Sequence, residues 1–450
     1  MINAIIAAAE YLNSMRIHRM FSIPLAFFIL ITAMSITAPQ VVLAALLWLL
    51  VALPFVGPPG MLIWLVNAWL RYVQSDFLFK MHETVLEVKI PKVIMKSPAA
   101  MERIFSDIVV TASDTTFIDR WWDGGLSPVY SFEIASFEGE LHFYIWCEGH
   151  LKEYVKATVY AQYPDVEIFE VLDYTSGINY DPDKMIAMGR EFRLTAPDAY
   201  PIKTYKGYEL DKNPSKAEQR VDPLSSVFET LSNIGPGEQM WLQIVISQDQ
   251  HGHAEHEAQH EIDKIFETLQ EETLASGAKS KAKSKLQPAQ DEQVKALTNT
   301  MDQNNIETGI RLMYLARKDS LHAEKFGADM KFIFKSFDSH LLNNIAGRSM
   351  RDHGLFDYPW QDIGGFLTVQ KIKDYTNSSL NGFRFKRISR TMIDAYKRRC
   401  FFDYPYHRRH FIMTPEELAT IYHYPTEETK TPGLVRIQSK KSEAPSDLPI

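Results

Sequence analysis

The sequence predicts an α+β protein in which an N-terminal transmembrane helical hairpin is followed by two ferredoxin-like (βαββαβ) modules, the second with a helical insertion. Three observations lead to this fold class: a long apolar stretch without charges, a set of alternating strand patterns broken by helical spacing, and a repeat of that order further along the chain. Hydrophobic residues make up 46% and charged residues 23%, which are ordinary values for globular proteins.

The apolar stretch covers residues 20–70, which contain no Asp, Glu, Lys, Arg or His. A bilayer core of about 30 Å is crossed by about 20 residues of helix, so this stretch has room for two spans with a break near Pro39. We therefore expect an N-terminal segment at 1–19 and a transmembrane hairpin at 20–75. The Gly and Pro residues at 57–60 leave two possibilities open for residues 58–74: a continued, kinked span or a separate helix at the interface.

The charges that flank this stretch predict its orientation. Arg16 and Arg19 precede it, Arg71 and Lys80 follow it, and no charge lies between. The positive-inside rule then places both ends in the cytoplasm. The only cysteines, Cys147 and Cys400, form no disulfide framework, which fits a reducing compartment. We expect a multi-pass protein of the cytoplasmic (inner) membrane whose soluble part is cytoplasmic.

Residues 80–175 show the pattern of a first ferredoxin-like domain. Apolar residues alternate over 86–90, recur at helical spacing over 98–108, alternate again over 130–147 around a turn at Gly139, return to helical spacing over 151–159, and end in a strand at 166–172. This is the order β-α-β-β-α-β, with both helices expected on one face of an antiparallel sheet.

A similar order recurs over residues 185–345, which we take as the second ferredoxin-like domain. Strands are predicted at 190–195, 240–247 and 310–314, with helices at 222–234 and 326–337. A polar helical insertion at 250–305 interrupts it; an exposed arm and a surface insertion without a role are both open. A C-terminal α-rich region at 346–425, with a capping box at Thr414–Glu417, and an extended tail at 426–450 complete the chain.

A zinc-peptidase pattern lies within the insertion. His256, Glu257 and His260 fit H-E-x-x-H, which on a helix places two imidazoles on one face and a carboxylate ready to polarise a metal-bound water. The neighbouring residues are polar and no third ligand stands out downstream, so we interpret this segment as a polar helix. A membrane-tethered zinc metallopeptidase is the alternative function. We assign no catalytic residue, no metal ligand and no cofactor.

Phosphate chemistry has one candidate site. A P-loop is excluded because the chain contains no Gly-Lys dipeptide. Basic residues interleaved with aromatic ones near the C-terminal end are candidates for contact with phosphates or lipid headgroups, and a solvated helix face is the alternative. These candidates are Arg384, Lys386, Arg387, Arg390, Lys397, Arg398 and Arg399.

A resemblance to a known group rests on phrases that follow one another along the chain: LEVKIP, SPAAME, LSNIGPGEQMWLQIVIS, GIRLMYLARKD, MTPEELATIYHYP and PGLVRIQSKKSEAPSDLP. They resemble the membrane-anchored N-terminal region ahead of the ATPase in type IV secretion and conjugation-type coupling proteins of candidate-phylum bacteria, which belong to the FtsK/HerA/VirD4-like group. In that group the last phrase leads into the ATPase domain, whereas this sequence stops at Ile450.

The resemblance implies a non-enzymatic membrane component that docks or scaffolds a separate FtsK/HerA/VirD4-like ATPase and associates with copies of itself. Contact with nucleic acid is an additional expectation, carried only by the basic residues above.

Overall fold

The computed structural model describes residues 32, 34, 36–91, 94, 96–109, 116–211, 222–249, 252–275, 288–322, 329–349, 379–402, 410–426, 433–434 and 436–437. It is a mixed helix and strand structure with an apolar N-terminal helix and an antiparallel sheet. Two compact units can be distinguished. Among the described residues, the first contains α3 up to Phe77 together with residues 117–124, and the second contains the sheet.

The N-terminal helix α3 (Pro39–Lys80) is continuous for 42 residues and passes through Pro54, Pro58 and Pro59. Each proline removes one backbone hydrogen bond, so the helix is weakest in this stretch. Within the described residues one helical stretch, Leu50–Lys80, is long and apolar enough to cross a membrane. Residues 58–74 continue the helix rather than starting a separate one. The first arm of the expected hairpin lies almost entirely outside the described residues.

The first half of the sheet has the predicted element order: β1 (Glu83–Pro91), α4 (Ala99–Val109), β2 (Tyr130–Phe137), β3 (Glu140–Glu148), α5 (Lys152–Gln162) and β4 (Glu167–Val171). In space the strands lie in the order β4-β1-β3-β2, and every neighbouring pair is antiparallel. The β2–β3 turn places Glu138 and Gly139 at positive φ, as tight hairpins require.

The second half contains β5 (Met185–Leu194), α6 (Leu224–Ser232), β6 (Glu238–Gln248), β7 (Ile306–Arg317), α9 (Met330–Phe332) and β8 (Ile345–Ser349). Its spatial order, β8-β5-β7-β6, repeats that of the first half. The helix expected at 326–337 is shorter within the described residues: α9 is followed by a 3-10 turn, η5 (Lys335–Phe337), and Phe334 and Phe337 are buried. The apolar residues that predicted one helix lie instead in two short helical turns.

The two halves share one sheet, which the sequence did not predict. Strand β2 pairs antiparallel with β6 from Tyr130 opposite Ile246 to Phe137 opposite Gln239, so the edge strands of the halves join. Two short strands extend the sheet: β9 (Phe411–Met413) pairs with β7, and β10 (Arg436–Ile437) pairs with β1. The ten described strands therefore form a single sheet.

Each face of this sheet is covered by helices. Alternate residues of a strand point to opposite faces. One set, which includes Phe132 and Leu242, packs with α4, α6 and α12 (Pro415–Ile421) in the larger core. The other set, which includes Trp146 and Trp241, packs with α11 (Ser379–Lys397). The predicted capping box at the start of α12 is confirmed, since the Thr414 hydroxyl and the Glu417 carboxylate each bond the other residue's backbone N–H.

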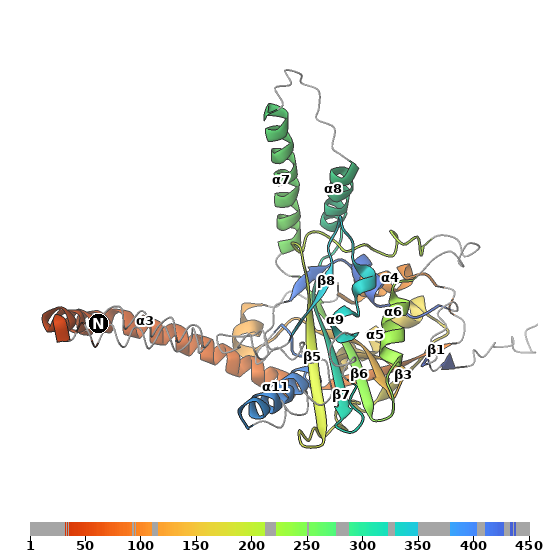
Figure 1. Ribbon diagram of the computed structural model, residues 1–450, viewed down its shortest axis with the longest axis horizontal. Helices are drawn as coiled ribbons and strands as arrows, with labels where there is room; N and C mark the ends of the chain where they lie inside the picture. Colours follow the sequence, from red (N-terminus) through yellow and green to blue (C-terminus); the bar gives the residue numbers. More distant parts are fainter. Residues whose placement is uncertain are drawn as a thin grey trace, which may run out of the picture. The chain divides into compact units, whose positions relative to one another are not determined.

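The polar insertion forms a pair of helices between β6 and β7. Helices α7 (His253–Ala275) and α8 (Pro288–Met301) lie side by side and project beyond the sheet (Figure 1). A small apolar cluster, with Ala258 and Leu297 beside Ala199, holds their base.

Candidate functional site: a buried polar cluster beneath helix α11

A row of polar residues crosses the join between the two halves. Glu133 on β2 is opposite Gln243 on β6, Gln243 is opposite Arg311 on β7, and Arg311 is opposite Glu191 on β5. All four are buried. Residues paired across strands lie on the same face of a sheet, so this row lies on the face that α11 covers.

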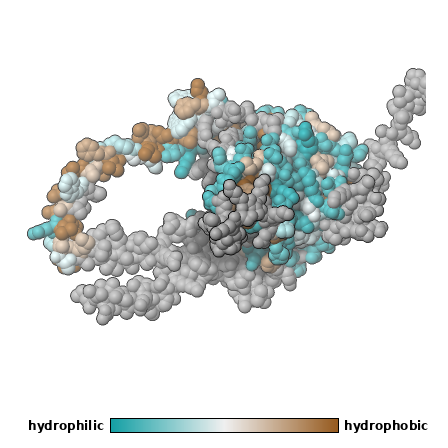
Figure 2. Space-filling model, turned by 90° about the horizontal axis from the view of Figure 1, so that it is seen from above, coloured by the Kyte–Doolittle hydropathy of each residue, from teal (hydrophilic) through white to brown (hydrophobic). Residues whose placement is uncertain are grey.

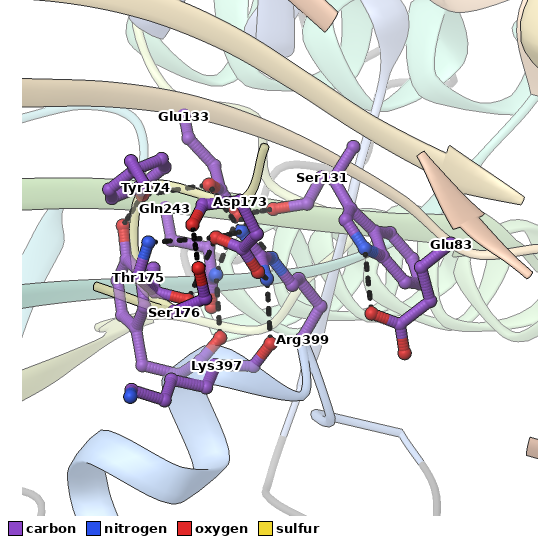
Figure 3. Close-up of polar contacts among 12 residues, drawn as sticks. Glu83, Ser131, Glu133, Asp173, Tyr174, Thr175, Ser176, Gln243, Lys397 and Arg399 are labelled. Carbon is purple, nitrogen blue, oxygen red and sulfur yellow. Dashed lines mark hydrogen bonds and ion pairs between the residues drawn. The ribbon is translucent and has the colours of Figure 1, made fainter. Parts of the chain in front are cut away.

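Arg399 connects this row to the segment that follows α11. It adopts a left-handed backbone conformation with φ of 49° and is almost fully buried. Its guanidinium donates to both carboxylate oxygens of Glu133, at 3.0 and 3.2 Å, and to both of Asp173, one of them at 3.1 Å (Figure 3). Paired bonds of this kind match the planar guanidinium and are among the stronger polar contacts in proteins.

Neighbouring side chains complete the hydrogen bonding of Glu133. The Tyr174 hydroxyl, the Gln243 amide and the Ser131 hydroxyl each donate to its carboxylate at 2.8 Å (Figure 3). The hydroxyls of Tyr174 and Tyr396 are 2.9 Å apart. A buried carboxylate with several donors and an arginine is compensated in charge and in hydrogen bonding. The arrangement therefore fixes side chains in place.

Arg311 holds the end of α11 against the sheet. Its guanidinium donates to the carbonyl oxygens of Ala395 at 2.7 Å and Cys400 at 2.9 Å, and lies 4.6 Å from the centre of the Phe401 ring. The strand makes room for that ring at Gly309, where an added Cβ would lie 2.4 Å from it. The C-terminal region is thus locked onto the second half of the sheet.

The electrostatics of the cluster favour fixed protonation states. Burial opposes ionisation of Asp173, but the hydrogen bonds and charge of Arg399 outweigh it, so the pKa of Asp173 is lowered. Burial and the nearby Glu133 charge raise the pKa of Tyr174 and of Tyr396 well above the ordinary value. At neutral pH the phenols stay protonated and Asp173 stays charged. The cluster can therefore orient its own side chains and hold α11 on the sheet.

The structure separates the basic residues that the sequence grouped together. Arg387 and Arg390 are exposed on α11, whereas Arg399 is buried in the cluster. Three others make local contacts: Lys386 pairs with Asp183 at 2.5 Å, Lys397 donates to the Ile178 carbonyl oxygen at 2.9 Å, and Arg398 pairs with Asp394 at 3.0 Å. The side chain of Arg384 is not among those that the structure describes. The seven residues therefore do not form a single basic surface.

The H-E-x-x-H segment lies in the first part of α7. The Glu257 carboxylate accepts the Ala199 backbone N–H at 3.1 Å, which ties the helix to the loop after β5. His256 is exposed, and His260 is exposed with its Nδ1 3.7 Å from a Glu261 oxygen. Among the side chains that the structure describes, no group of three or more His, Cys, Asp or Glu could hold a metal ion. Glu257 thus serves as a structural contact of the arm.

Sequence reasoning did not identify Glu133, Asp173 or Arg311. One signal was present for Glu133, because a charged residue stands between Phe132 and Ile134 within an apolar strand. That alternation is also the normal pattern of a half-solvated strand, so it indicated an exposed face. Only the position of α11 shows that this face is buried.

Comparison with known families relates most of the sheet to a described family. The model for a domain of unknown function (DUF8128) matches residues 83–325, from β1 to the end of β7 and slightly beyond. That range is more than half of the chain, and it includes both β2 and β6 with the helical arm. No curated protein matches the sequence. The chain belongs to the family described as Domain of unknown function (DUF8128).

Proposed function

We propose that this chain is a non-enzymatic, membrane-anchored component that docks or scaffolds a translocation ATPase of a type IV secretion or conjugation-like system. The observation that carries this proposal is the direct succession of an apolar helix and the sheet. Only Met81 and His82 lie between α3 and β1. A linker this short restricts the sheet-bearing unit to the vicinity of the bilayer when α3 is inserted.

The resemblance to coupling proteins is the second support. Its phrases fall on parts of the molecule that pack together, namely β1, β6, β7, the β9–α12 segment and β10. The last phrase, which leads into the ATPase domain in that group, pairs with the sheet through Arg436 and Ile437 beside Ile90 and Pro91 of β1.

We further propose that each half is a ferredoxin-like module. Each has a β-α-β-β order at its start and the strand order 4-1-3-2 that such modules share. The buried contacts of Arg399 and Arg311 fix α11 on the joined sheet. Such a rigid platform suits a scaffold, because a docking surface loses less entropy when it is already ordered.

The membrane topology that we propose is a hairpin with the sheet-bearing unit in the cytoplasm. Its support is the charge distribution: Arg16 and Arg19 before the apolar stretch, and Arg71 and Lys80 after it. A protease added to intact cells should leave a C-terminal epitope tag uncut, and should remove it once the inner membrane is opened. Removal of the tag on intact cells would refute this orientation.

Co-purification tests the docking function. The tagged full chain should retain an FtsK/HerA/VirD4-like ATPase encoded in the same genome when both are expressed together and extracted in mild detergent. We expect Phe266→Asp, at an exposed apolar position on the arm, to reduce the yield of ATPase several-fold. Phe169→Asp, at a similarly exposed position on β4, is the matched control. No ATPase above the untagged background would refute docking.

A further inference from the structure

A short aromatic segment packs on the end of the apolar helix. Residues Phe117–Gly124 belong to the same compact unit as α3 and contain the π-helical turn η1 (Asp119–Asp123). The Trp69 indole N–H donates to the Trp121 carbonyl oxygen at 3.1 Å, and the Trp69 and Trp122 rings lie 6.0 Å apart. The segment is therefore attached to α3 by both a hydrogen bond and ring contacts.

Gly124 brings the two backbones together. It has φ of 72°, and an added Cβ would lie 2.4 Å from the Val73 carbonyl oxygen. Val73 is buried there, unlike most of the helix before it. Both the conformation and the close approach require glycine at this position.

The attachment lies where the helix changes from apolar to charged. The charge-free stretch ends at Leu70 and Arg71 follows it. About 20 residues of helix span a bilayer core, so a span that ends at Leu70 would begin near Leu50, the start of the stretch able to cross a membrane. Figure 2 shows apolar residues recurring along the described helix. Trp69 and Tyr72 then fall at the level of the lipid headgroups.

The outer side of this segment is apolar and exposed. Phe117 is 75%, Ile118 66% and Trp122 72% exposed. Tryptophan and tyrosine concentrate at membrane–water interfaces, where the ring meets acyl chains and the N–H or O–H meets headgroups. Asp119 and Asp123, in the same turn, would remain on the aqueous side.

We propose that residues 117–124, together with Trp69 and Tyr72, form an interfacial anchor that inserts into the headgroup layer of a phospholipid bilayer. We infer that lipid covers these exposed aromatic side chains because they adjoin the end of α3 that reaches the membrane surface. This inference rests on the membrane anchoring within the proposed function. It adds a second contact with lipid, which would set the depth and rotation of α3.

Site-directed spin labelling tests this proposal. Both native cysteines are buried, so introduced cysteines are the accessible sites for a nitroxide. The full chain is reconstituted into vesicles of equal parts phosphatidylcholine and phosphatidylglycerol, with a label at Ile118→Cys, Leu62→Cys or Leu172→Cys. Leu62, near the middle of the span from Leu50 to Leu70, reports the bilayer core, and Leu172, directly after β4, reports water.

We expect the ratio of oxygen collisions to nickel-complex collisions at position 118 to exceed that at position 172 several-fold and to fall below that at position 62. Adding Gly124→Ala should lower the ratio at 118, because the segment can no longer seat on Val73. If the collision ratio at 118 equals that at 172 while the ratio at 62 shows lipid, the interfacial anchor alone is overturned. If the ratios at both 118 and 62 equal that at 172, the membrane anchor is overturned as well. ATPase docking is judged separately by co-purification.

Discussion

Removing the guanidinium of Arg399 tests whether the buried cluster holds α11 on the sheet. Arg399→Met keeps most of the side-chain volume but leaves Glu133 buried without its positive partner. Breaking a buried ion pair from one side destabilises proteins by about 3–5 kcal/mol. Glu133 keeps three other donors, and Asp173 retains a quarter of its side-chain exposure, so we expect the lower part of that range.

The neighbouring residue provides a matched control. Arg398 forms an exposed pair with Asp394 four residues earlier, so Arg398→Met should change stability by about 0–1 kcal/mol. Urea unfolding of the detergent-solubilised full chain, followed by tryptophan fluorescence, measures both variants against the parent. Adding Glu133→Gln to Arg399→Met should recover part of the loss, because the uncompensated charge is gone. Equal midpoints for the Arg399 and Arg398 variants would refute the assignment of a stabilising role to the cluster.

Three further predictions concern other contacts of the sheet-bearing unit. Gly309→Ala should destabilise the chain by about 1–3 kcal/mol in urea unfolding, because the new methyl group would overlap the Phe401 ring; an unchanged midpoint would contradict that packing. Burial lowers the pKa of His423, but the charge of Asp222 outweighs it, so this pKa is raised above its ordinary value of about 6.5. The stabilisation from this pair is thus complete below about pH 6.5 and is lost as the pH rises through the folded-state pKa; Asp222→Asn should flatten that pH dependence of the urea midpoint, and a slope equal to the parent's would count against the pair. Thr414→Ala removes the hydroxyl of the capping box and should lower the free energy of unfolding by about 1 kcal/mol, measured in the same way, whereas no loss would show that the cap is dispensable.

Local patterns predicted the elements but not how the halves meet. Alternation over residues 86–90 and 130–147 indicated β1 and the β2–β3 hairpin, since a strand with one buried face must alternate. The same patterns recurred in the second half. Nothing local to β2 or β6 shows that their edges pair, because an edge strand offers the same backbone groups to any partner. The joined sheet emerges only from the tertiary structure.

The basic residues near the C-terminal end show the same limit for the candidate site. By sequence, Arg398 and Arg399 are equivalent members of a charged run. In the structure, Arg398 pairs on the helix surface and Arg399 is buried with Glu133, a residue 266 positions earlier in the chain. Burial of a charge depends on what packs over it, and that contact is distant in sequence.

The sequence by itself determined the apolar helix, because a helix that crosses a bilayer needs a run of residues without charge, and such a run can be read directly from the sequence. It also determined the element order of the first half and the cap of α12, since both depend on neighbours a few residues apart. Tertiary structure decided the β2–β6 join, the burial of Glu133 beneath α11, and the seating of residues 117–124 on Trp69 and Val73. Each of these links segments far apart in the chain, and their closeness follows from the packing of the whole molecule.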